Sequence, residues 1–385
     1  MLRSRYLLLI CAVVIFAIGL VMVFNTSSAD VLDRHLSVST HAAVARQLVY
    51  ALLGVAAGLA LRFIGYRALL DHSFGILVIL CLLLALVFVP GIGCVRNGAR
   101  RWIGAAGLTV QPSEFVKIFL PLFAIHTLAG AELTWFRFAR FAALAAVPLA
   151  LVMLEPDNGT TAIIAVTLLI VCLITGVKAR YWLLPMVVLA LLGGVAAWQL
   201  PYVQKRIQVY MHPELDLLGK GHQPYQAKIA AGAGGVFGRG LGQSMQKLTY
   251  LPEAQNDYIA AVYAEESGLI GVLALIFLYM LFALLGYRVA CRAQDPTGFY
   301  LAVTLTSLIA IQAFLNLGVV SGIMPPKGLN LPFFSQGGSS LMANIIALTL
   351  ILSVDGQTDR DHSRGDWRTS DSRTGAGAPA AGASL

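Results

Sequence analysis

The sequence predicts an all-α protein that crosses a membrane about ten times. Of its 385 residues, 58% are hydrophobic and only 12% are charged, and the mean hydropathy is +0.77. This composition is typical of a polytopic membrane protein and excludes an ordinary soluble fold. The apolar residues gather in runs of about 17 to 25, the length at which a helix crosses a bilayer. One long polar segment, residues 200–258, interrupts these runs.

Ten apolar runs qualify as membrane-spanning helices. They cover residues 6–24, 44–63, 73–90, 113–130, 138–154, 159–176, 181–199, 259–287, 298–318 and 337–353. The first run follows Arg3 and Arg5, as the core of a signal peptide would. Its 19 residues exceed a signal core of about 7 to 15, so we expect a retained helix.

Lysine and arginine residues predict the orientation, because short cytoplasmic loops are enriched in them. Five pairs of cations fall on one side: Arg3 and Arg5, Arg62 and Arg67, Arg137 and Arg140, Lys178 and Arg180, and Arg288 and Arg292. Both termini are therefore expected to be cytoplasmic, with residues 200–258 as a large extracytoplasmic loop between helices seven and eight. Residues 355–385 lack apolar periodicity, which predicts a disordered cytoplasmic tail.

The net charge of +8 does not indicate nucleic-acid binding, because the sequence has no basic domain interleaved with aromatic residues. Cations that violate the orientation rule lie on the outer side, in the loop with Arg96, Arg100 and Arg101 and in the long polar segment. A polyanion on that face, such as a lipid-linked diphosphate, would explain them. The five cysteines have no paired spacing and no neighbouring histidine, so we expect buried thiols and neither disulfides nor a metal site.

Two polar clusters lie in the first half of the chain, both on the outer side. NGARRWIG leads to QPSEFVK, where Pro112 suits a first helical turn and Glu114 and Lys117 share one helix face. Charges at this depth are costly and tend to mark function, although a snorkelling ion pair that sets helix depth is the alternative. The second cluster, EPDNGT at 155–160, is also explained by a plain tight turn.

Two further clusters lie in the second half. A glycine run at 231–243 precedes LPEAQND, and its irregular spacing matches neither a dinucleotide fingerprint nor a P-loop. Asp257 ends this motif where an apolar run begins, so a helix N-cap and a functional carboxylate are both open. Residues 316–340 form a loop rich in Pro and Gly, which predicts a re-entrant wall of the same cavity, because irregular backbone at membrane depth must line a cavity or be buried.

Together these motifs resemble the SEDS family of shape, elongation, division and sporulation proteins, of the FtsW and RodA type. NGARRWI with QPSEFVK, EPDNGT, GGVFGRGLG with LPEAQNDYIAAV and EESG, and LPFFSQGGSS stand in the order and loops of that family. The likeness implies a SEDS-like transmembrane domain at 1–354 ahead of the tail at 355–385. LTYLPEA and PKGL are more similar to the FtsW division branch. Glu155 departs from the usual Gln, and Gln336 from the common Tyr.

The resemblance implies a peptidoglycan glycosyltransferase that polymerises lipid II, the undecaprenyl-diphosphate-linked disaccharide-peptide. It would act in cell division at the outer face of the bacterial cytoplasmic (inner) membrane. The implied partners are a class B penicillin-binding protein and other division proteins. No cofactor and no protein metal site is implied, whereas Mg²⁺ or Mn²⁺ bound to the lipid diphosphate stays open.

By the same resemblance, Asp257 matches the family's essential aspartate. We expect it to be the catalytic general base, with burial raising its pKa above the ordinary ~3.9. Preorganised cations are expected to stabilise the leaving diphosphate. The expected substrate-binding residues are Arg101, Glu114, Lys117, Asp157, Arg239, Lys327 and Ser339, with Arg100 behind them.

Two other kinds of function fit the same hydropathy. One is a flippase that carries the lipid precursor across the membrane, and the other is a non-catalytic scaffold of the division machinery. A transporter should place charges along a path that reaches both faces, whereas Glu114, Lys117, Asp157, Asp257 and Lys327 gather at one. A scaffold should tolerate loss of Asp257.

Overall fold

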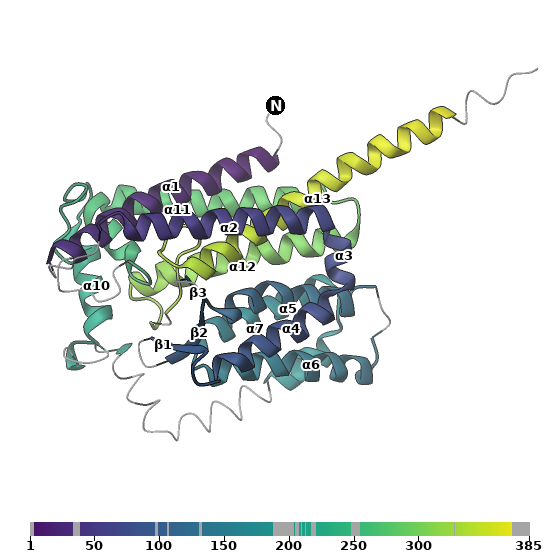
Figure 1. The fold of residues 1–385 in the computed structure, drawn as a ribbon, viewed down its shortest axis with the longest axis horizontal. Coiled ribbons are helices and arrows are strands. Elements are labelled where there is room, and N and C mark those ends of the chain that lie inside the picture. Colours follow the sequence, from purple (N-terminus) through teal and green to yellow (C-terminus); the bar gives the residue numbers. More distant parts are fainter. Residues whose placement is uncertain are drawn as a thin grey trace, which may run out of the picture.

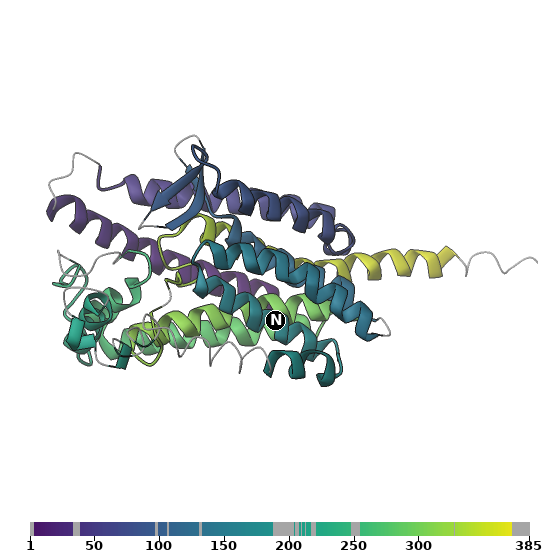
Figure 2. The ribbon, with the colours of Figure 1, turned by 90° about the horizontal axis from the view of Figure 1, so that it is seen from below.

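Long helices lying side by side make up most of the protein, and one end of the bundle carries a small sheet and helix α10 (Figures 1 and 2). This computed structural model describes residues 4–33, 39–96, 99–105, 108–130, 133–187, 204, 208, 210–211, 213–216, 221–247, 255–326 and 328–371. Helix α1 runs toward the sheet end, and α13 runs away from it (Figure 1).

The described helices follow the apolar runs closely. Before the long polar segment they are α1 (Ser4–Asp33), α2 (Ala42–Ile64), α3 (Tyr66–Asp71), α4 (Ser73–Val87), α5 (Pro112–Leu128), α6 (Trp135–Leu154) and α7 (Asn158–Ile174). Within and after it they are the 3₁₀ turn Pro213–Asp216, α10 (His222–Ala233), α11 (Ile259–Ala290), α12 (Pro296–Val320) and α13 (Gly338–Asp371).

The predicted polytopic membrane fold is confirmed. Among the described residues, α2, α6, α11, α12 and the Ser4–Ala29 part of α1 are long and apolar enough to cross a membrane. Shorter apolar helices cover Ser73–Val87, Asn158–Ile174 and Gly338–Val354. Nine of the ten predicted spans coincide with a described helix, and the span at 181–199 is described only as far as residue 187. The number ten therefore stays a prediction.

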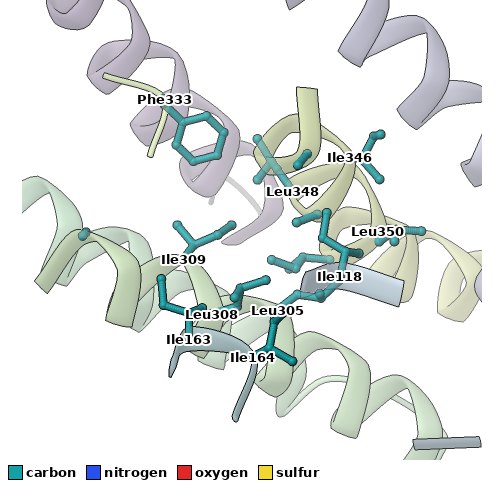
Figure 3. Packing of buried hydrophobic residues seen from close by; sticks show 14 of the residues in the cluster. Ile118, Ile163, Ile164, Leu305, Leu308, Ile309, Phe333, Ile346, Leu348 and Leu350 are labelled. Atoms are coloured by element: carbon teal, nitrogen blue, oxygen red, sulfur yellow. The ribbon is translucent and has the colours of Figure 1, made fainter. Parts of the chain in front are cut away.

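Apolar side chains from distant parts of the sequence fill the centre of the bundle. Figure 3 shows Ile118 of α5, Ile164 of α7 and Leu305 of α12 pointing into one cluster, which Leu350 of α13 completes. All four are fully buried. Lipid tails are as apolar as these side chains, so close van der Waals contact, rather than escape from water, stabilises such an interface.

The small sheet is absent from the prediction and is a minor addition to the helical fold. Strands β1 (Gly93–Arg96), β2 (Ala99–Ala105) and β3 (Leu108–Val110) pair antiparallel in the order β1-β2-β3. Arg96 pairs with Ala99 across the Asn-Gly dipeptide, and Ile103 pairs with Val110. Asn-Gly is a strong hairpin signal, so the sequence held the information for this turn. The sheet places Arg101 and Trp102 beside the helix ends.

The Pro- and Gly-rich loop between α12 and α13 is irregular, as predicted, and its second part, residues 331–335, is buried. Phe333 and Phe334 are almost fully covered. Four side chains donate hydrogen bonds to its carbonyls: Gln47 to Ser335 at 3.0 Å, Tyr279 to Pro332 at 2.6 Å, Gln312 to Asn330 at 2.8 Å and Asn316 to Leu329 at 2.6 Å. These bonds replace the ladder that a helix would supply, which makes irregular backbone tolerable at this depth.

The glycine run packs tightly against α11 instead of forming an open loop. Helix α11 is broken at Gly268, whose φ of +65° and ψ of −167° only glycine adopts readily. A Cβ at Gly268 would collide with the backbone of Gly238, and one at Gly238 would collide with the carbonyl of Glu266. The backbones therefore approach to a distance that excludes side chains. The described parts of the predicted loop at 200–258 are thus partly helical and partly packed, and its side of the membrane stays a prediction.

Two further expectations differ from the structure in part. Helix α13 is described through Asp371, so residues 355–371 continue the helix where we predicted a tail without regular structure. Residues 372–385 lie outside the described part, and the domain boundary stays a prediction. All five cysteines are free thiols, but only Cys11 and Cys172 are buried and Cys291 is exposed.

Candidate functional site

A polar cavity of about 710 Å³ lies at the sheet end of the bundle. Its walls come from α1, α2, β2, the starts of α5, α7 and α13, residues 255–257 and the α12–α13 loop. Five of the predicted site residues line it together: Arg101, Glu114, Asp157, Asp257 and Ser339. The four motif clusters of the sequence therefore meet at one place, although they are separated by up to about 240 residues.

Asp257 contributes to the cavity wall from the segment just before α11. The N-cap position of α11 is occupied by Tyr258, whose side chain makes no capping bond, so Asp257 is not the N-cap that the sequence left open. Its Oδ2 faces Gly328, where an added Cβ would lie 3.4 Å from that oxygen. Its backbone carbonyl accepts a hydrogen bond of 2.9 Å from Asn316 Nδ2. The carboxylate thus lies between two chain segments at the cavity surface.

Arg101 joins the sheet to the turn between α6 and α7. Its Nε donates to the Glu155 carbonyl at 2.8 Å, and its Nη2 donates to the Pro156 carbonyl at 2.7 Å. Asp157 caps α7 by accepting from the Thr160 amide at 3.1 Å. The turn chemistry expected from the sequence is therefore present, and it also places Arg101 and Asp157 in the same cavity wall.

Glu155 lies in this turn as a fully buried carboxyl. Within the described part of the chain, neither of its carboxyl oxygens has a hydrogen-bond partner. Burial, with a smaller contribution from the Asp157 charge, raises the pKa of Glu155 from 4.5 to about 8, and Arg101 opposes the shift. Burial also raises the pKa of Asp157, opposed by Arg101 and by the hydrogen bond from Thr160.

This raised pKa predicts a pH-dependent stability. The folded protein keeps Glu155 protonated up to about pH 8, whereas the unfolded chain ionises it near 4.5. The unfolded state therefore binds fewer protons between these values, and stability falls as pH rises through this window. Glu155→Gln should remove that fall and gain about 1–3 kcal/mol at pH 8. Thermal unfolding in detergent at pH 5.5 and pH 8 measures this, and parallel wild-type and variant curves would contradict it.

Glu114 and Lys117 form an ion pair inside the protein. Lys117 is only 2% exposed, and its Nζ contacts the Glu114 carboxylate and donates to Gln312 Oε1 at 2.8 Å. This burial excludes the snorkelling alternative, which needs a charged head in water. Glu114 reaches the cavity surface, whereas Lys117 lies behind it. The pair therefore contributes a carboxylate whose charge is compensated from within the bundle.

Ser339 and Gln111 tie three walls of the cavity together. Ser339 Oγ accepts from the Gln111 amide at 2.9 Å and donates to the Thr109 carbonyl at 3.3 Å. The Gln111 side chain donates to Asp157 Oδ2 at 3.0 Å. The starts of α5, α7 and α13 are thereby connected by short polar bonds, which holds the cavity in a defined shape.

Besides Lys117, one described residue among the predicted site residues does not line this cavity. Arg239 lies outside the lining, and its Nη1 pairs with the buried Glu265 carboxylate at 3.0 Å. It stabilises the packed glycine segment, a role that sequence spacing could not distinguish from phosphate binding. Lys327 lies outside the described residues. Arg100 is an exposed residue of β2 and does not line the cavity either.

Helix α2 contributes residues that the sequence reasoning missed. Arg46, Gln47 and Tyr50 all line the cavity. Tyr50 is fixed by two hydrogen bonds with the Thr109 backbone, at 2.8 and 3.0 Å. Arg46 and Tyr50 are four apart in an apolar run and so share a helix face, which is the signal that could have identified them.

The cavity combines two arginines with three carboxylates in a polar, concave site. Arg46 and Arg101 offer guanidinium groups suited to phosphate, and Asp257 offers a carboxylate that can accept a proton. In the described part of the chain, no three His, Cys, Asp or Glu side chains are arranged to hold a metal ion. Such an arrangement suits transfer of a group that leaves as an anion.

The chain matches a family model. The model FTSW_RODA_SPOVE, described as cell cycle protein, matches residues 5–360. A relative from Geobacter metallireducens named probable peptidoglycan glycosyltransferase FtsW is 38% identical, covering 91% of this chain and 94% of its own length. Stage V sporulation protein E of Bacillus subtilis is 39% identical, covering 90% of this chain and 96% of its own length.

Solved structures share the fold. A chain from a study of how a peptidoglycan synthase complex coordinates polymerization and crosslinking has a TM-score of 0.75 and 29% identity, covering 91% of this chain and 97% of that one. The rod shape determining protein RodA of Thermus thermophilus has a TM-score of 0.65 and 28% identity, covering 90% and 95% respectively.

Proposed function

The chain belongs to the FtsW, RodA and SpoVE family of cell cycle proteins, and from this premise we propose that it polymerises lipid II into glycan strands. It is a multi-pass membrane protein and a peptidoglycan glycosyltransferase with a division-related role. The observation that carries the finer proposal is the polar cavity in which Asp257 and two arginines meet.

The proposed reaction forms one glycosidic bond and breaks one bond between a sugar and diphosphate. The 4-hydroxyl oxygen of one sugar attacks the anomeric carbon of another, and the bond from that carbon to the diphosphate oxygen breaks. The diphosphate leaves with the electron pair, and the hydroxyl proton passes to the Asp257 carboxylate. A positioned base commonly contributes about 10² to 10⁴ in rate.

Cations in the cavity support the departure of the diphosphate. Arg46 and Arg101 are the arginines that line it. The guanidinium of Arg101 is held by two carbonyls, so its position is fixed before substrate binds. Preorganised charge of this kind stabilises a developing anion without reorganisation at the moment of reaction. Lys117 acts one layer behind, by compensating Glu114.

The proposal also includes a location and partners. The arginine and lysine pattern supports a chain in the bacterial cytoplasmic membrane with both termini in the cytoplasm and the cavity on the outer side. Similarity to a chain of a peptidoglycan synthase complex supports assembly with a crosslinking enzyme, and we propose a class B penicillin-binding protein. The FtsW relatives support a division role rather than one in elongation.

The test is polymerisation by the purified protein in vesicles that contain lipid II, with and without a class B penicillin-binding protein. We expect glycan polymer, which a gel of labelled product measures. Movement of lipid II between leaflets without polymer would instead support a flippase. Neither polymer nor movement under any condition would support a scaffold.

Lys117→Met is expected to lower kcat/KM for lipid II by about 10- to 100-fold. The substitution leaves the Glu114 carboxylate at the cavity surface without its ammonium partner, so the cavity repels the diphosphate. Loss of a hydrogen bond to a charged group, about 1.5–3 kcal/mol, sets this magnitude. Lys228→Met in α10, outside the cavity lining, is the matched control. Unchanged kcat/KM in the Lys117 variant would remove this residue from substrate handling.

A further inference from the structure

Two buried amide side chains on α12 connect the walls of the cavity from behind. Gln312 and Asn316 are one helical turn apart and are each 1% exposed. Gln312 accepts from Lys117 and donates to the Asn330 carbonyl, both at 2.8 Å. Neither amide lines the cavity, so neither touches a bound sugar or phosphate directly. Their effect on the site has to pass through the residues that they hold.

Asn316 is the amide that reaches the segment of Asp257. Its Nδ2 donates to the Asp257 carbonyl at 2.9 Å and to the Leu329 carbonyl at 2.6 Å. Both donor hydrogens of one –NH₂ group are therefore used on two chain segments that are about seventy residues apart in sequence. Leu329 follows Gly328, the residue that the Asp257 carboxylate faces.

We infer that Asn316 is a positioning residue for Asp257. The inference rests on the proposed function, because it assigns the geometry of the proposed base to a residue that does not touch the substrate. The amide joins the backbone of residue 257 to the backbone of residue 329 at a set spacing. That spacing determines where the carboxylate stands relative to Gly328 and the opening of the cavity.

The surroundings of Asn316 explain why loss of its two hydrogen bonds should lower the rate of polymerisation. The side chain is enclosed by protein, so water does not replace its bonds when they are lost. Both carbonyls would then lose the donor that they share, and the two segments would no longer be joined through this side chain. A shift of about 1 Å in a reacting group can cost about 10²-fold in rate.

The experiment compares Asn316→Ala and Asn316→Leu with wild type in the lipid II polymerisation assay. Leucine restores the branched shape of asparagine without its donors. Both variants should lower kcat by about 10- to 100-fold and leave KM for lipid II within about threefold, because Arg46 and Arg101 are untouched. Rates are normalised to the folded fraction from size exclusion and thermal unfolding. The leucine variant fills the volume, so it separates lost donors from a lost fold.

Ser307→Ala is the matched control. Ser307 is a buried polar residue of the same helix, and its hydroxyl bonds with the Tyr287 hydroxyl at 3.0 Å, away from the cavity lining. This control should keep the wild-type kcat. A wild-type kcat in Asn316→Ala, or full rescue by Asn316→Leu, would overturn the positioning role alone. Absence of polymer from wild type would overturn the proposed function and, with it, this inference.

Discussion

Asp257→Asn is expected to lower the rate of glycan polymerisation by about 10² to 10⁴, the share that a positioned general base supplies. Asparagine has nearly the same shape, but it cannot accept the proton of the attacking hydroxyl. The backbone bond from Asn316 to residue 257 does not involve the side chain and should survive the substitution. The measurement is the initial rate of polymer formation from labelled lipid II at saturating substrate.

Binding and folding controls decide what such a loss means. Lipid II binding by Asp257→Asn should stay close to wild type, because the arginines of the cavity are unchanged. Tyr258, not Asp257, occupies the N-cap of α11, so the thermal stability of the variant should also be retained. A variant that polymerises at the wild-type rate would show that Asp257 is dispensable. A variant that fails to fold would indicate a structural role.

Glu265→Ala is expected to cause the largest loss of stability, about 3–5 kcal/mol, the range found when one partner of a buried charged network is removed. Glu265 is fully buried. It accepts hydrogen bonds from four groups of the segment 239–246: Arg239 Nη1, Ser244 Oγ and the amides of Met245 and Gln246. Alanine would leave these donors without an acceptor and would release the segment from α11. Thermal or denaturant unfolding in detergent measures the effect.

Arg239→Ala is the matched comparison for this prediction. The Arg239 side chain is 43% exposed, so its half of the ion pair should contribute no more than about 1 kcal/mol. The KM for lipid II should stay unchanged, because Arg239 does not line the cavity. Equal stability of Glu265→Ala and wild type would contradict the anchoring role. A raised KM in Arg239→Ala with normal stability would restore the substrate-binding role expected from the sequence.

Local features of the fold could be predicted because they depend on neighbours in sequence. Apolar runs of bilayer length became helices, and Asp157 with Thr160 formed the expected turn at the start of α7. The hairpin around Arg96 and Ala99 was missed, although the Asn-Gly signal was present. The break at Gly268 could not be predicted from helix periodicity, because its cause is contact with Gly238 from another segment.

The candidate site could be predicted in its members but not in their roles. Arg101, Glu114, Asp157 and Asp257 meet at one cavity as the motifs suggested. Lys117 and Arg239 looked equivalent as cations, yet one compensates Glu114 behind the cavity and the other pairs with Glu265. The sequence shows which residues are charged, whereas the packing of the fold determines which charged group each of them pairs with.

The sequence by itself determined that this is a membrane protein, the approximate positions of its helices and the family to which it belongs. It did so because the length of apolar runs and short polar motifs are properties of consecutive residues. Only the tertiary structure decided which polar groups face the cavity and which form hydrogen bonds that fix the segments of its wall. Asn316 illustrates this, since an amide in an apolar helix has no assigned role until two distant carbonyls lie 2.9 and 2.6 Å from it. Buried polar groups require partners, and those partners come from segments that the chain brings together only when it folds.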